Sequence, residues 1–402
     1  MIKNVLMIGW EYPPLNSGGL GVACQGLVNS LSAIGINIVF YLPQRITNIN
    51  QKKGVVFNFI DCAFFKEADK NFLYTYTYLI DSNKGKSVKF YKNGGTLVEL
   101  VKIYANKLLE NTKDYNFDII HAHDWLTVPA ALALREISKK PLILHIHATE
   151  FDRAGGIYSL NSEIASIEKE GLIRADKVIA VSQYTKEKIV NLYNILPERI
   201  EVVHNGISSE NEDVFLNRDK SFFKNKNTVL FVGRLTIQKG VDWFLKAAEK
   251  ISKINENTVF LIVGDGDYKG KAIELANDMK ISDKVIFTGF LRGGELKKAY
   301  KLADVFVLPS VSEPFGITAL EAIKSGVPVI LSNNSGAREI IKGSIGVDFW
   351  NTKDMAEKIT AVLSYPRLKN KLIEDSKEDL GFATWERAAD KIVKIYNNLT
   401  HG

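Results

Sequence analysis

The stretch from Pro309 to Pro328, PSVSEPFGITALEAIKSGVP, places two glutamates, Glu313 and Glu321, on either side of a Phe-Gly turn. The helix-forming residues after that turn, ended by a glycine and a proline, predict a short helix. The N-terminus of a helix exposes backbone N–H groups and attracts anions, phosphate above all. These residues leave two interpretations open. Either the glutamates flank an anion site, or Glu313 is a capping or solvated loop residue and Glu321 pairs with Lys324.

The whole chain has the composition of a folded protein with more than one domain. Its 402 residues suit two domains, and the 46% hydrophobic and 24% charged fractions are typical of globular proteins. The N-terminal run lacks the features of a signal peptide, and no stretch reaches the ~18 apolar residues of a membrane span. The two cysteines lack CxxC spacing and fit a reducing compartment. We therefore expect a cytoplasmic protein, with membrane contact at most peripheral. The net charge of +6 is not gathered into a nucleic-acid-binding tail.

Short apolar runs alternate with helical segments in two series. The first series of predicted strands covers 4–10, 36–43, 118–123, 142–148, 177–182 and 199–207, and the second covers 228–235, 258–266, 284–290, 305–310 and 328–332. Such repeated βαβ units predict two doubly wound parallel-sheet domains. The polar segment 208–227 has the composition of a linker. We place the boundary near residue 218, which gives an N-terminal domain 1–218 and a C-terminal domain 219–382.

Residues 50–115 follow this rhythm less clearly. They contain Tyr74, Tyr76 and Tyr78, whose period-2 spacing favours an ordinary strand over an inserted hairpin or a lid.

Several chemically informative residues follow predicted strands, where open α/β sheets bind ligands. Gly18, Gly19 and Gly21 form a strand-to-helix loop that is neither GxGxxG nor a P-loop, so a ligand-binding loop and a structural turn are equally favoured. Arg234 and Lys239 follow the first strand of the second series and form either a pyrophosphate clamp or a pair of surface cations.

The later VGDGDYKG element has Gly264 and Gly266 after a strand, but its next glycine, Gly270, comes one position late for the dinucleotide fingerprint. This spacing disfavours a dinucleotide-dependent oxidoreductase.

Two HxH pairs, HAHDW at 121–125 and HIHA at 145–148, end two predicted strands. Alternation along a strand would place the two histidines of each pair on a common face. A metal-dependent hydrolase is therefore an alternative, although the other histidines, His204 and His401, offer few further ligands. No G-x-S-x-G element supports a serine hydrolase.

Taken together, the motifs resemble those of retaining glycosyltransferases with the GT-B architecture, in which two Rossmann-like domains face a central cleft. The motifs that carry the resemblance are SGGL, HAHDW, HIHATEFDR, VSQYTKEKI, VVHNGI, GRLTIQKG, VGDG and PSVSEPFGITALEAIKSGVPVI. Within this class the chain is most similar to the glycogen and starch synthases and their relatives, from residue 4 to about 340. The final segment, 383–402, resembles the helix that crosses back onto the first domain.

The resemblance implies roles for individual residues of the donor site. Glu313 would bind hydroxyls of the donor sugar, and Glu321 the ribose of the nucleotide. Arg234 and Lys239 would neutralise the departing diphosphate. Backbone N–H groups would donate hydrogen bonds to the phosphate. The glycine loops, and a pocket in which backbone groups contact the nucleobase, would complete the site. The residues implied for these backbone contacts are Phe315, Gly316, Ile317, Thr318, Gly18, Gly19, Gly264, Phe290 and Leu291.

In the N-terminal domain the resemblance implies three further contacts. His147 would touch the sugar near the reacting carbon, Asp124 would face the acceptor, and Asn205 would line the cleft.

The implied reaction is metal-independent transfer of a hexosyl unit, with glucose favoured, from a nucleotide diphosphate sugar to a saccharide or glucan acceptor. UDP- or ADP-glucose is the favoured donor, and no bound cofactor or metal is implied. Retention would follow from front-face attack, because a covalent intermediate needs a carboxylate on the opposite face that nothing in the sequence identifies. Asn16 stands where bacterial glycogen and starch synthases have a lysine, which argues against glycogen synthase proper. A nucleotide-sugar epimerase, a phosphorylase and a non-catalytic sugar-binding subunit are alternatives.

Overall fold

The structure, a computed structural model, divides the chain into two compact units. Unit 1 comprises Met1–Phe151, Gly156–Gly206 and Trp385–Gly402, and unit 2 comprises Asp152–Gly155 and Ile207–Thr384. The residues described are 2–15, 18–60, 62, 96–112, 116–155, 160–208, 223 and 226–400. The predicted boundary near residue 218, Asn16 and the three tyrosines at 74, 76 and 78 lie outside the described residues.

Unit 1 is built on a seven-stranded parallel sheet with the order β3-β2-β1-β4-β5-β6-β7. Its strands are β1 (Asn4–Ile8), β2 (Asn37–Leu42), β3 (Val55–Phe59), β4 (Ile119–His123), β5 (Leu142–Ile146), β6 (Lys177–Ala180) and β7 (Ile200–Val202). The six strands predicted for this half are confirmed. Strand β3 lies in the less regular 50–115 region and was not predicted, because its run, VVFNF, is short and the sequence around it does not follow the alternation of the other strands and helices.

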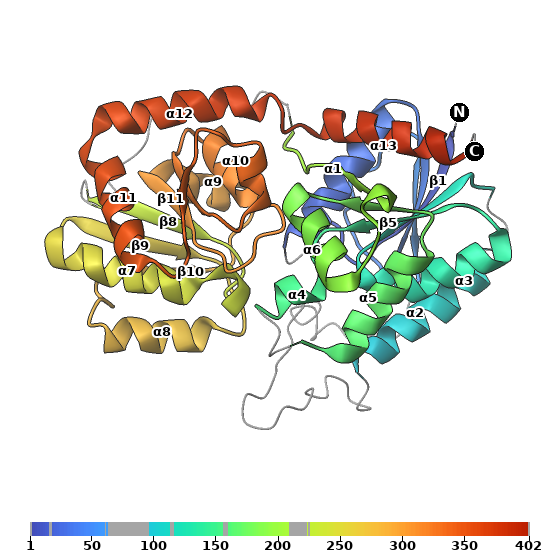
Figure 1. Cartoon of the computed structure of the whole chain (residues 1–402), viewed down its shortest axis with the longest axis horizontal. Helices are drawn as coiled ribbons and strands as arrows, with labels where there is room; N and C mark the ends of the chain where they lie inside the picture. Colours follow the sequence, from blue (N-terminus) through green and yellow to red (C-terminus); the bar gives the residue numbers. More distant parts are fainter. Residues whose placement is uncertain are drawn as a thin grey trace. The chain divides into compact units, whose positions relative to one another are not determined.

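Helices cover both faces of this sheet (Figure 1). They are α1 (Gly19–Ala33), α2 (Leu97–Asn111), α3 (Val128–Ser138), α5 (Ser162–Arg174), α6 (Gln183–Tyr193) and α13 (Trp385–Thr400), with the 3-10 turns η2 (Trp125–Thr127) and η4 (Pro197–Arg199). The short helix α4 (Glu150–Arg153) is divided, with its first two residues in unit 1 and its last two in unit 2. Helices α1 and α13 contact each other although they come from opposite ends of the chain. Their approach is close, because a Cβ atom at Gly26 would lie 2.1 Å from Cε2 of Trp385.

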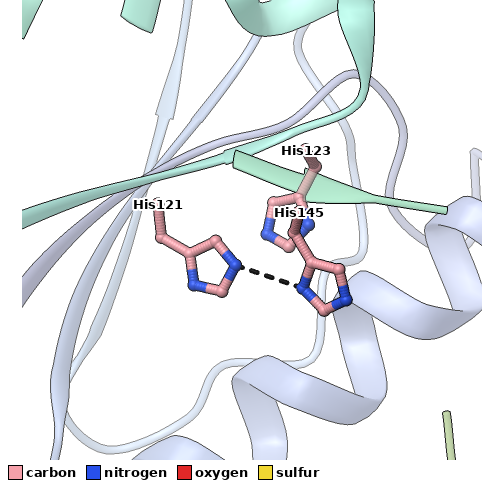
Figure 2. A group of neighbouring side chains, drawn as sticks. All are labelled: His121, His123 and His145. Carbon is pink, nitrogen blue, oxygen red and sulfur yellow. Dashed lines mark hydrogen bonds between the residues drawn. The ribbon is translucent and has the colours of Figure 1, made fainter. Parts of the chain in front are cut away.

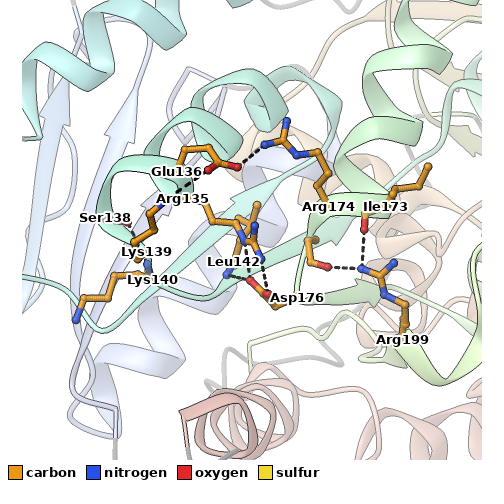
Figure 3. Close-up of polar contacts among 11 residues, drawn as sticks. Arg135, Glu136, Ser138, Lys139, Lys140, Leu142, Ile173, Arg174, Asp176 and Arg199 are labelled. Carbon is orange, nitrogen blue, oxygen red and sulfur yellow. Dashed lines mark hydrogen bonds and ion pairs between the residues drawn. The ribbon is translucent and has the colours of Figure 1, made fainter.

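A polar network in unit 1 ties α3 and α5 to the starts of β5 and β6 (Figure 3). Asp176 accepts hydrogen bonds from Arg135 Nε at 2.9 Å, from Arg135 Nη2 at 2.7 Å and from the backbone N–H of Leu142 at 2.8 Å. Arg174 donates to Glu136 Oε1 at 2.6 Å. These paired charges fix the amino-terminal ends of β5 and β6. The carboxyl ends of the strands, where open α/β sheets bind ligands, lie at the opposite end.

Unit 2 is built on a six-stranded parallel sheet with the order β10-β9-β8-β11-β12-β13. Its strands are β8 (Asn227–Val232), β9 (Thr258–Val263), β10 (Val285–Gly289), β11 (Val305–Leu308), β12 (Val329–Ser332) and β13 (Ile345–Val347). Its helices are α7 (Val241–Ile254), α8 (Lys269–Asp278), α9 (Gly293–Leu302), α10 (Ile317–Lys324), α11 (Thr352–Ser364) and α12 (Pro366–Leu380), with the turns η6 (Ile237–Lys239) and η7 (Gly336–Glu339). The five predicted strands are confirmed, and the short β13 is an addition.

The central strands of unit 2 are continuous apolar runs because helices cover the sheet on both faces. The long helix α12 is anchored by Lys369, whose Nζ lies 2.6 Å from Asp304 Oδ1. Asp304 is 2% exposed and also accepts the backbone N–H of Thr228 at 3.1 Å. The ion pair thus joins α12 to the starts of β8 and β11. Across the described ranges, no helix has the length and apolar character needed to cross a membrane.

Candidate active site

In unit 2 the residues singled out from the sequence lie along one edge of the sheet. Arg234 follows β8, Gly264 follows β9, Leu291 follows β10 and Glu313 follows β11. These four strands are neighbours in the order β10-β9-β8-β11 and all run parallel. Their carboxyl ends therefore meet at the edge where open α/β sheets bind ligands.

The centre of this edge is an ion pair between Lys239 and Glu313. Lys239 Nζ lies 2.7 Å from Oε2 and 2.9 Å from Oε1 of the glutamate, whose side chain is only 5% exposed. The hydroxyl of Ser310 also donates to Oε2 at 3.0 Å. The turn η6 that carries Lys239 is held against the end of β11, since a Cβ atom at Gly240 would lie 2.0 Å from the carbonyl oxygen of Pro309. Glu313 is therefore a buried, paired carboxylate and not the solvated loop residue of the alternative interpretation.

The helix predicted after Glu313 is α10, and it begins as the sequence indicated. Gly316 occupies the N-cap position with φ 104°, a left-handed conformation that glycine adopts without a Cβ clash. No side chain caps this helix among the described residues. The first N–H groups of an α-helix have no partner within the helix, so those of Ile317 and Thr318 form an N-terminus suited to an anion.

Glu321 lies one turn inside α10 and is half-buried. Its Oε2 accepts a hydrogen bond from the hydroxyl of Tyr300 at 2.8 Å. Desolvation raises the pKa of this carboxyl group, and the Tyr300 hydrogen bond lowers it in part. Lys324 donates to the carbonyl oxygen of Ser208 at 2.8 Å, so Tyr300, and not Lys324, is the observed side-chain partner of Glu321.

Gly264 and Gly266 pack the loop after β9 against the loop that carries Arg234. A Cβ atom at Gly264 would lie 1.9 Å from the carbonyl oxygen of Gly233, and one at Gly266 would lie 2.3 Å from that of Leu235. Gly264 also has φ 143°. Both glycines thus permit a close backbone approach that fixes the position of Arg234.

In unit 1 the two HxH pairs come together on one face of neighbouring strands. His121 and His123 lie on β4, and His145 and His147 lie on and just after β5, which pairs with β4 in register His123–His145. The predicted common face of each pair is confirmed, because His121 stacks on His123 with ring centroids 4.6 Å apart and His145 on His147 at 4.4 Å. Figure 2 shows three of these rings and the hydrogen bond from β4 to β5.

Hydrogen bonds divide the four rings into two rows. In the His121 row, the Tyr396 hydroxyl lies 2.6 Å from His121 Nδ1, and His121 Nε2 lies 3.2 Å from His145 Nδ1. In the His123 row, His123 Nδ1 lies 3.0 Å from His147 Nε2. Burial lowers the pKa of all four histidines, that of His123 to about 3. The rings are therefore neutral at physiological pH.

Asp124 connects the two HxH segments through the backbone. Its Oδ1 accepts the N–H of His147 at 2.6 Å and that of Ala148 at 3.4 Å. Asp124 has φ 58° and ψ 173°, a backbone conformation that strains any residue except glycine. The carboxylate thereby fixes the chain where β5 ends.

The other predicted residues of unit 1 lie after β1 and β7. Gly18 is the N-cap of α1, and Gly19 is its first residue. The buried Glu11 accepts the N–H of Gly21 at 3.2 Å, so a side chain of the protein already contacts this helix N-terminus. Asn205 follows β7 and is 6% exposed.

Besides Ser310, which lies in the same PSVSEP stretch as Glu313, three residues of these sites were missed from the sequence. Glu11 lies three residues after the end of β1, in WEYPP, and a carboxylate before a glycine loop is a signal that could have found it. Tyr300 lies on α9 and Tyr396 on α13, far along the chain from their partners, so nothing local marks them.

Comparisons with known proteins agree with this arrangement. Residues 17–211 match the sequence profile described as Glycosyltransferase Family 4, and residues 213–379 match Glycosyl transferases group 1. An uncharacterized glycosyltransferase of Methanocaldococcus jannaschii is 32% identical over 98% of this chain and 97% of its own length. A protein named glycogen synthase from Mycobacterium tuberculosis is 27% identical over 98% of this chain and 94% of its own length.

Solved structures show the same fold at lower sequence identity. A sucrose-phosphate synthase from Thermosynechococcus elongatus superposes with a TM-score of 0.80 over 99% of both chains at 19% identity. The two parallel-sheet units are thus those of the GT-B fold. The chain belongs to the retaining GT-B glycosyltransferases of family 4, the class that acts on nucleotide sugars.

Proposed function

We propose that this glycosyltransferase moves a glucosyl unit from UDP- or ADP-glucose to a saccharide acceptor, with retention and without a metal ion. The observation that carries the proposal is the buried Lys239–Glu313 pair beside the N-terminus of α10, at the carboxyl edge of the unit 2 sheet. The Lys239 cation and the N–H groups at the start of α10 suit a diphosphate, and the Glu313 carboxylate suits the hydroxyls of a sugar. The glycogen synthase named among the relatives supports a glucosyl donor.

Donor binding would exchange partners within this pair. As the structure stands, Lys239 and Glu313 neutralise each other. A diphosphate near Lys239 Nζ would take over that cation, and sugar hydroxyls would donate to the Glu313 oxygens. Every charge keeps a partner through the exchange, so neither group is left buried and unpaired.

Arg234 and the first turn of α10 would complete the diphosphate site. Charge develops on the leaving group as the anomeric bond breaks, and preorganised donors stabilise it most where water is excluded. These groups would supply the stabilisation that other transferases obtain from a divalent cation. Glu321, oriented by Tyr300, would bind the ribose hydroxyls of the nucleotide.

The reaction would proceed on one face of the sugar. The bond from the anomeric carbon to the diphosphate oxygen breaks, and a bond from that carbon to the acceptor oxygen forms. The acceptor hydroxyl proton passes to a phosphate oxygen of the departing nucleotide. We assign His147 to contact with the sugar and Asp124 to the acceptor side. Gly18, Gly19 and Asn205 would contribute to binding the substrates.

A thermal-shift panel of UDP-, ADP- and GDP-glucose with a chelator present tests the proposal. A ligand that binds only the folded state raises the melting temperature, so we expect a rise with UDP- or ADP-glucose. The Lys239→Met variant should lose that rise. Lys253→Met, which removes a surface lysine of α7 that is 70% exposed, should keep it.

Product analysis then separates the alternatives. Transfer yields a new glycosidic bond and free nucleoside diphosphate in equal amounts, with the anomeric configuration of the donor. An epimerase would yield an altered sugar, a phosphorylase would consume inorganic phosphate, and a sugar-binding subunit would bind without turnover. The absence of any shift at millimolar donor would contradict the donor-site assignment of Lys239 and Glu313.

A further inference from the structure

The four histidines of the two rows in unit 1 are polar side chains in buried positions. His121 and His123 are 0% exposed, His145 is 1% and His147 is 9% exposed. Buried polar groups are normally paired, yet His123 Nε2, His145 Nε2 and His147 Nδ1 have no hydrogen-bond partner among the described residues. Such an arrangement calls for a chemical account.

A shared metal ion is the first candidate, since one nitrogen from each of His121, His123 and His145 lies within 4.8 Å of the others. An imidazole lone pair lies in the ring plane, so a ligated ion must lie close to the plane of every ring at ~2.1 Å from nitrogen. The rings of His121 and His123 are stacked with planes only 18° apart. Two planes that are nearly parallel do not intersect near either ring. His121 and His123 therefore cannot both direct a nitrogen lone pair at the same ion.

The hydrogen bonds instead couple the tautomers within each row. A neutral imidazole has one N–H and one bare nitrogen. If His123 Nδ1 carries the proton, it donates to His147 Nε2, and His147 must carry its own proton on Nδ1. If His147 Nε2 carries the proton, it donates to His123 Nδ1, and His147 Nδ1 is bare. The tautomer of His123 therefore decides whether His147 Nδ1 is a donor or an acceptor.

Burial selects between these two states. Each leaves one N–H without a protein partner, either on His147 Nδ1 or on His123 Nε2. Orphaned N–H groups are rarer in folded proteins than under-satisfied acceptors. His147 is the more exposed of the two, at 9% against 0%, and lies just after β5 at the carboxyl end of the sheet, whereas His123 lies within β4. The proton without a protein partner therefore belongs on His147.

We propose that His123 is a positioning residue: its Nδ1–H donates to His147 Nε2 and so commits His147 Nδ1–H to donate to an oxygen of the donor sugar. The contact with the sugar rests on the proposed function, but the tautomer does not. His123 acts only through His147. The His121 row stacks on the His123 row, with His121 against His123 and His145 against His147. It holds the rings of His123 and His147 in place but does not determine their tautomers.

The tautomer can be measured without any substrate. Ring nitrogen-15 chemical shifts separate protonated from bare nitrogens, and the chain has six histidines, so assignment by single substitution is practical. We expect His147 to be protonated at Nδ1 and bare at Nε2 at neutral pH. In His123→Phe, which keeps a flat ring in the stack, His147 should shift toward the Nε2–H form. In His123→Asn, the side-chain amide can again donate, and the Nδ1–H form should return.

Kinetics supply the second measurement. With an active donor and acceptor, we expect His123→Phe to lower kcat about 10- to 100-fold while the KM for the donor changes less than about threefold. His123→Asn should recover most of kcat. The matched control is His121→Phe, an equally buried ring in the other row, which should leave both the His147 tautomer and kcat near the wild-type values.

Several results would overturn the proposal. An Nε2–H tautomer of His147 in the wild-type protein would do so even if a variant failed to fold. So would equal effects of His121→Phe and His123→Phe, which would indicate packing alone, or near-stoichiometric zinc or iron in the purified protein. If the tautomers are as expected but no nucleotide sugar is turned over, the proposed function fails while the role of His123 toward His147 stands.

Discussion

Lys239 and Glu313 hold each other in a nearly closed pair, with Nζ 2.7 Å from Oε2 and side chains 19% and 5% exposed. Removing one partner leaves a buried charge unpaired, which costs about 3 kcal/mol or more. We therefore expect Lys239→Met to lower the free energy of unfolding of unit 2 by about 3 kcal/mol, measured by urea denaturation. The double variant Lys239→Met/Glu313→Gln should recover a large part of that loss.

Activity should respond differently from stability to these same substitutions. Both Lys239→Met and the more stable double variant should lose about 100-fold or more in kcat/KM, because the diphosphate loses its cation. Lys253→Met should match the wild type in both measurements. A double variant that regained activity together with stability would show that Lys239 acts only as the structural partner of Glu313.

Asp124 offers a test that separates backbone strain from carboxylate function. Asp124→Ala and Asp124→Gly both remove the acceptor of the His147 N–H, but only glycine relieves the conformation at φ 58° and ψ 173°. We expect the glycine variant to be more stable than the alanine variant by about 1–2 kcal/mol in urea denaturation. Both should lose activity to a similar extent, because neither holds the end of β5. Equal stability of the two variants would show that the backbone conformation of Asp124 is not strained.

Two glycines of unit 2 provide a matched pair for the loop that carries Arg234. Gly264→Ala places a Cβ atom 1.9 Å from the Gly233 carbonyl oxygen, whereas a Cβ atom at Gly270, on α8, meets nothing within 4 Å. We expect Gly264→Ala to cost about 2 kcal/mol or more and to weaken donor binding. Gly270→Ala should be neutral or should stabilise by up to about 1 kcal/mol, since alanine favours a helix. Melting temperatures with and without donor measure both effects.

The histidine rows predict a loss of stability in mild acid. Their pKa values are lowered in the folded state from the ordinary value of 6.5, so below that pH the unfolded chain binds protons that the folded chain does not. Stability is then full above about pH 6.5 and falls as the pH falls, by about 1 kcal/mol per histidine down to about pH 5.5. Urea denaturation at the two pH values should show a smaller loss for His123→Phe than for the wild type, by about 1 kcal/mol. The carboxylates titrate equally in both proteins and cancel in this difference.

Local patterns in the sequence were sufficient to predict much of the fold. The apolar runs are strands because a parallel sheet covered by helices needs apolar side chains on both faces. Gly316 precedes α10 because the N-cap position has a positive φ, which glycine adopts without strain. The same patterns predicted that Glu313 and Glu321 border a helix N-terminus. Strand β3 was missed since its run, VVFNF, is short and lies in the stretch 50–115, where the sequence does not follow the regular alternation of strands and helices.

Contacts between distant segments were beyond local patterns. HxH spacing predicts a common face for two histidines on one strand, but not that β4 and β5 are neighbours in register, nor that Tyr396 reaches His121 from 275 residues away. Likewise Glu321 has Lys324 within reach along its own helix, yet its hydrogen bond goes to Tyr300 on another helix. Tertiary packing decides between such partners, and single-sequence patterns do not record it.

The closing of unit 1 by α13 has a consequence for how the protein is made. The ring of Trp385 rests on Gly26, and Tyr396 meets His121, so the first unit lacks part of its interior until residues 385–400 have left the ribosome. The strands β8 to β13 and the helices α7 to α12 of unit 2 all lie between residues 227 and 380 and can fold during synthesis. The residues of unit 1 that precede unit 2 in the chain should thus reach their native state only after unit 2 has folded, with the α1 face uncovered until then.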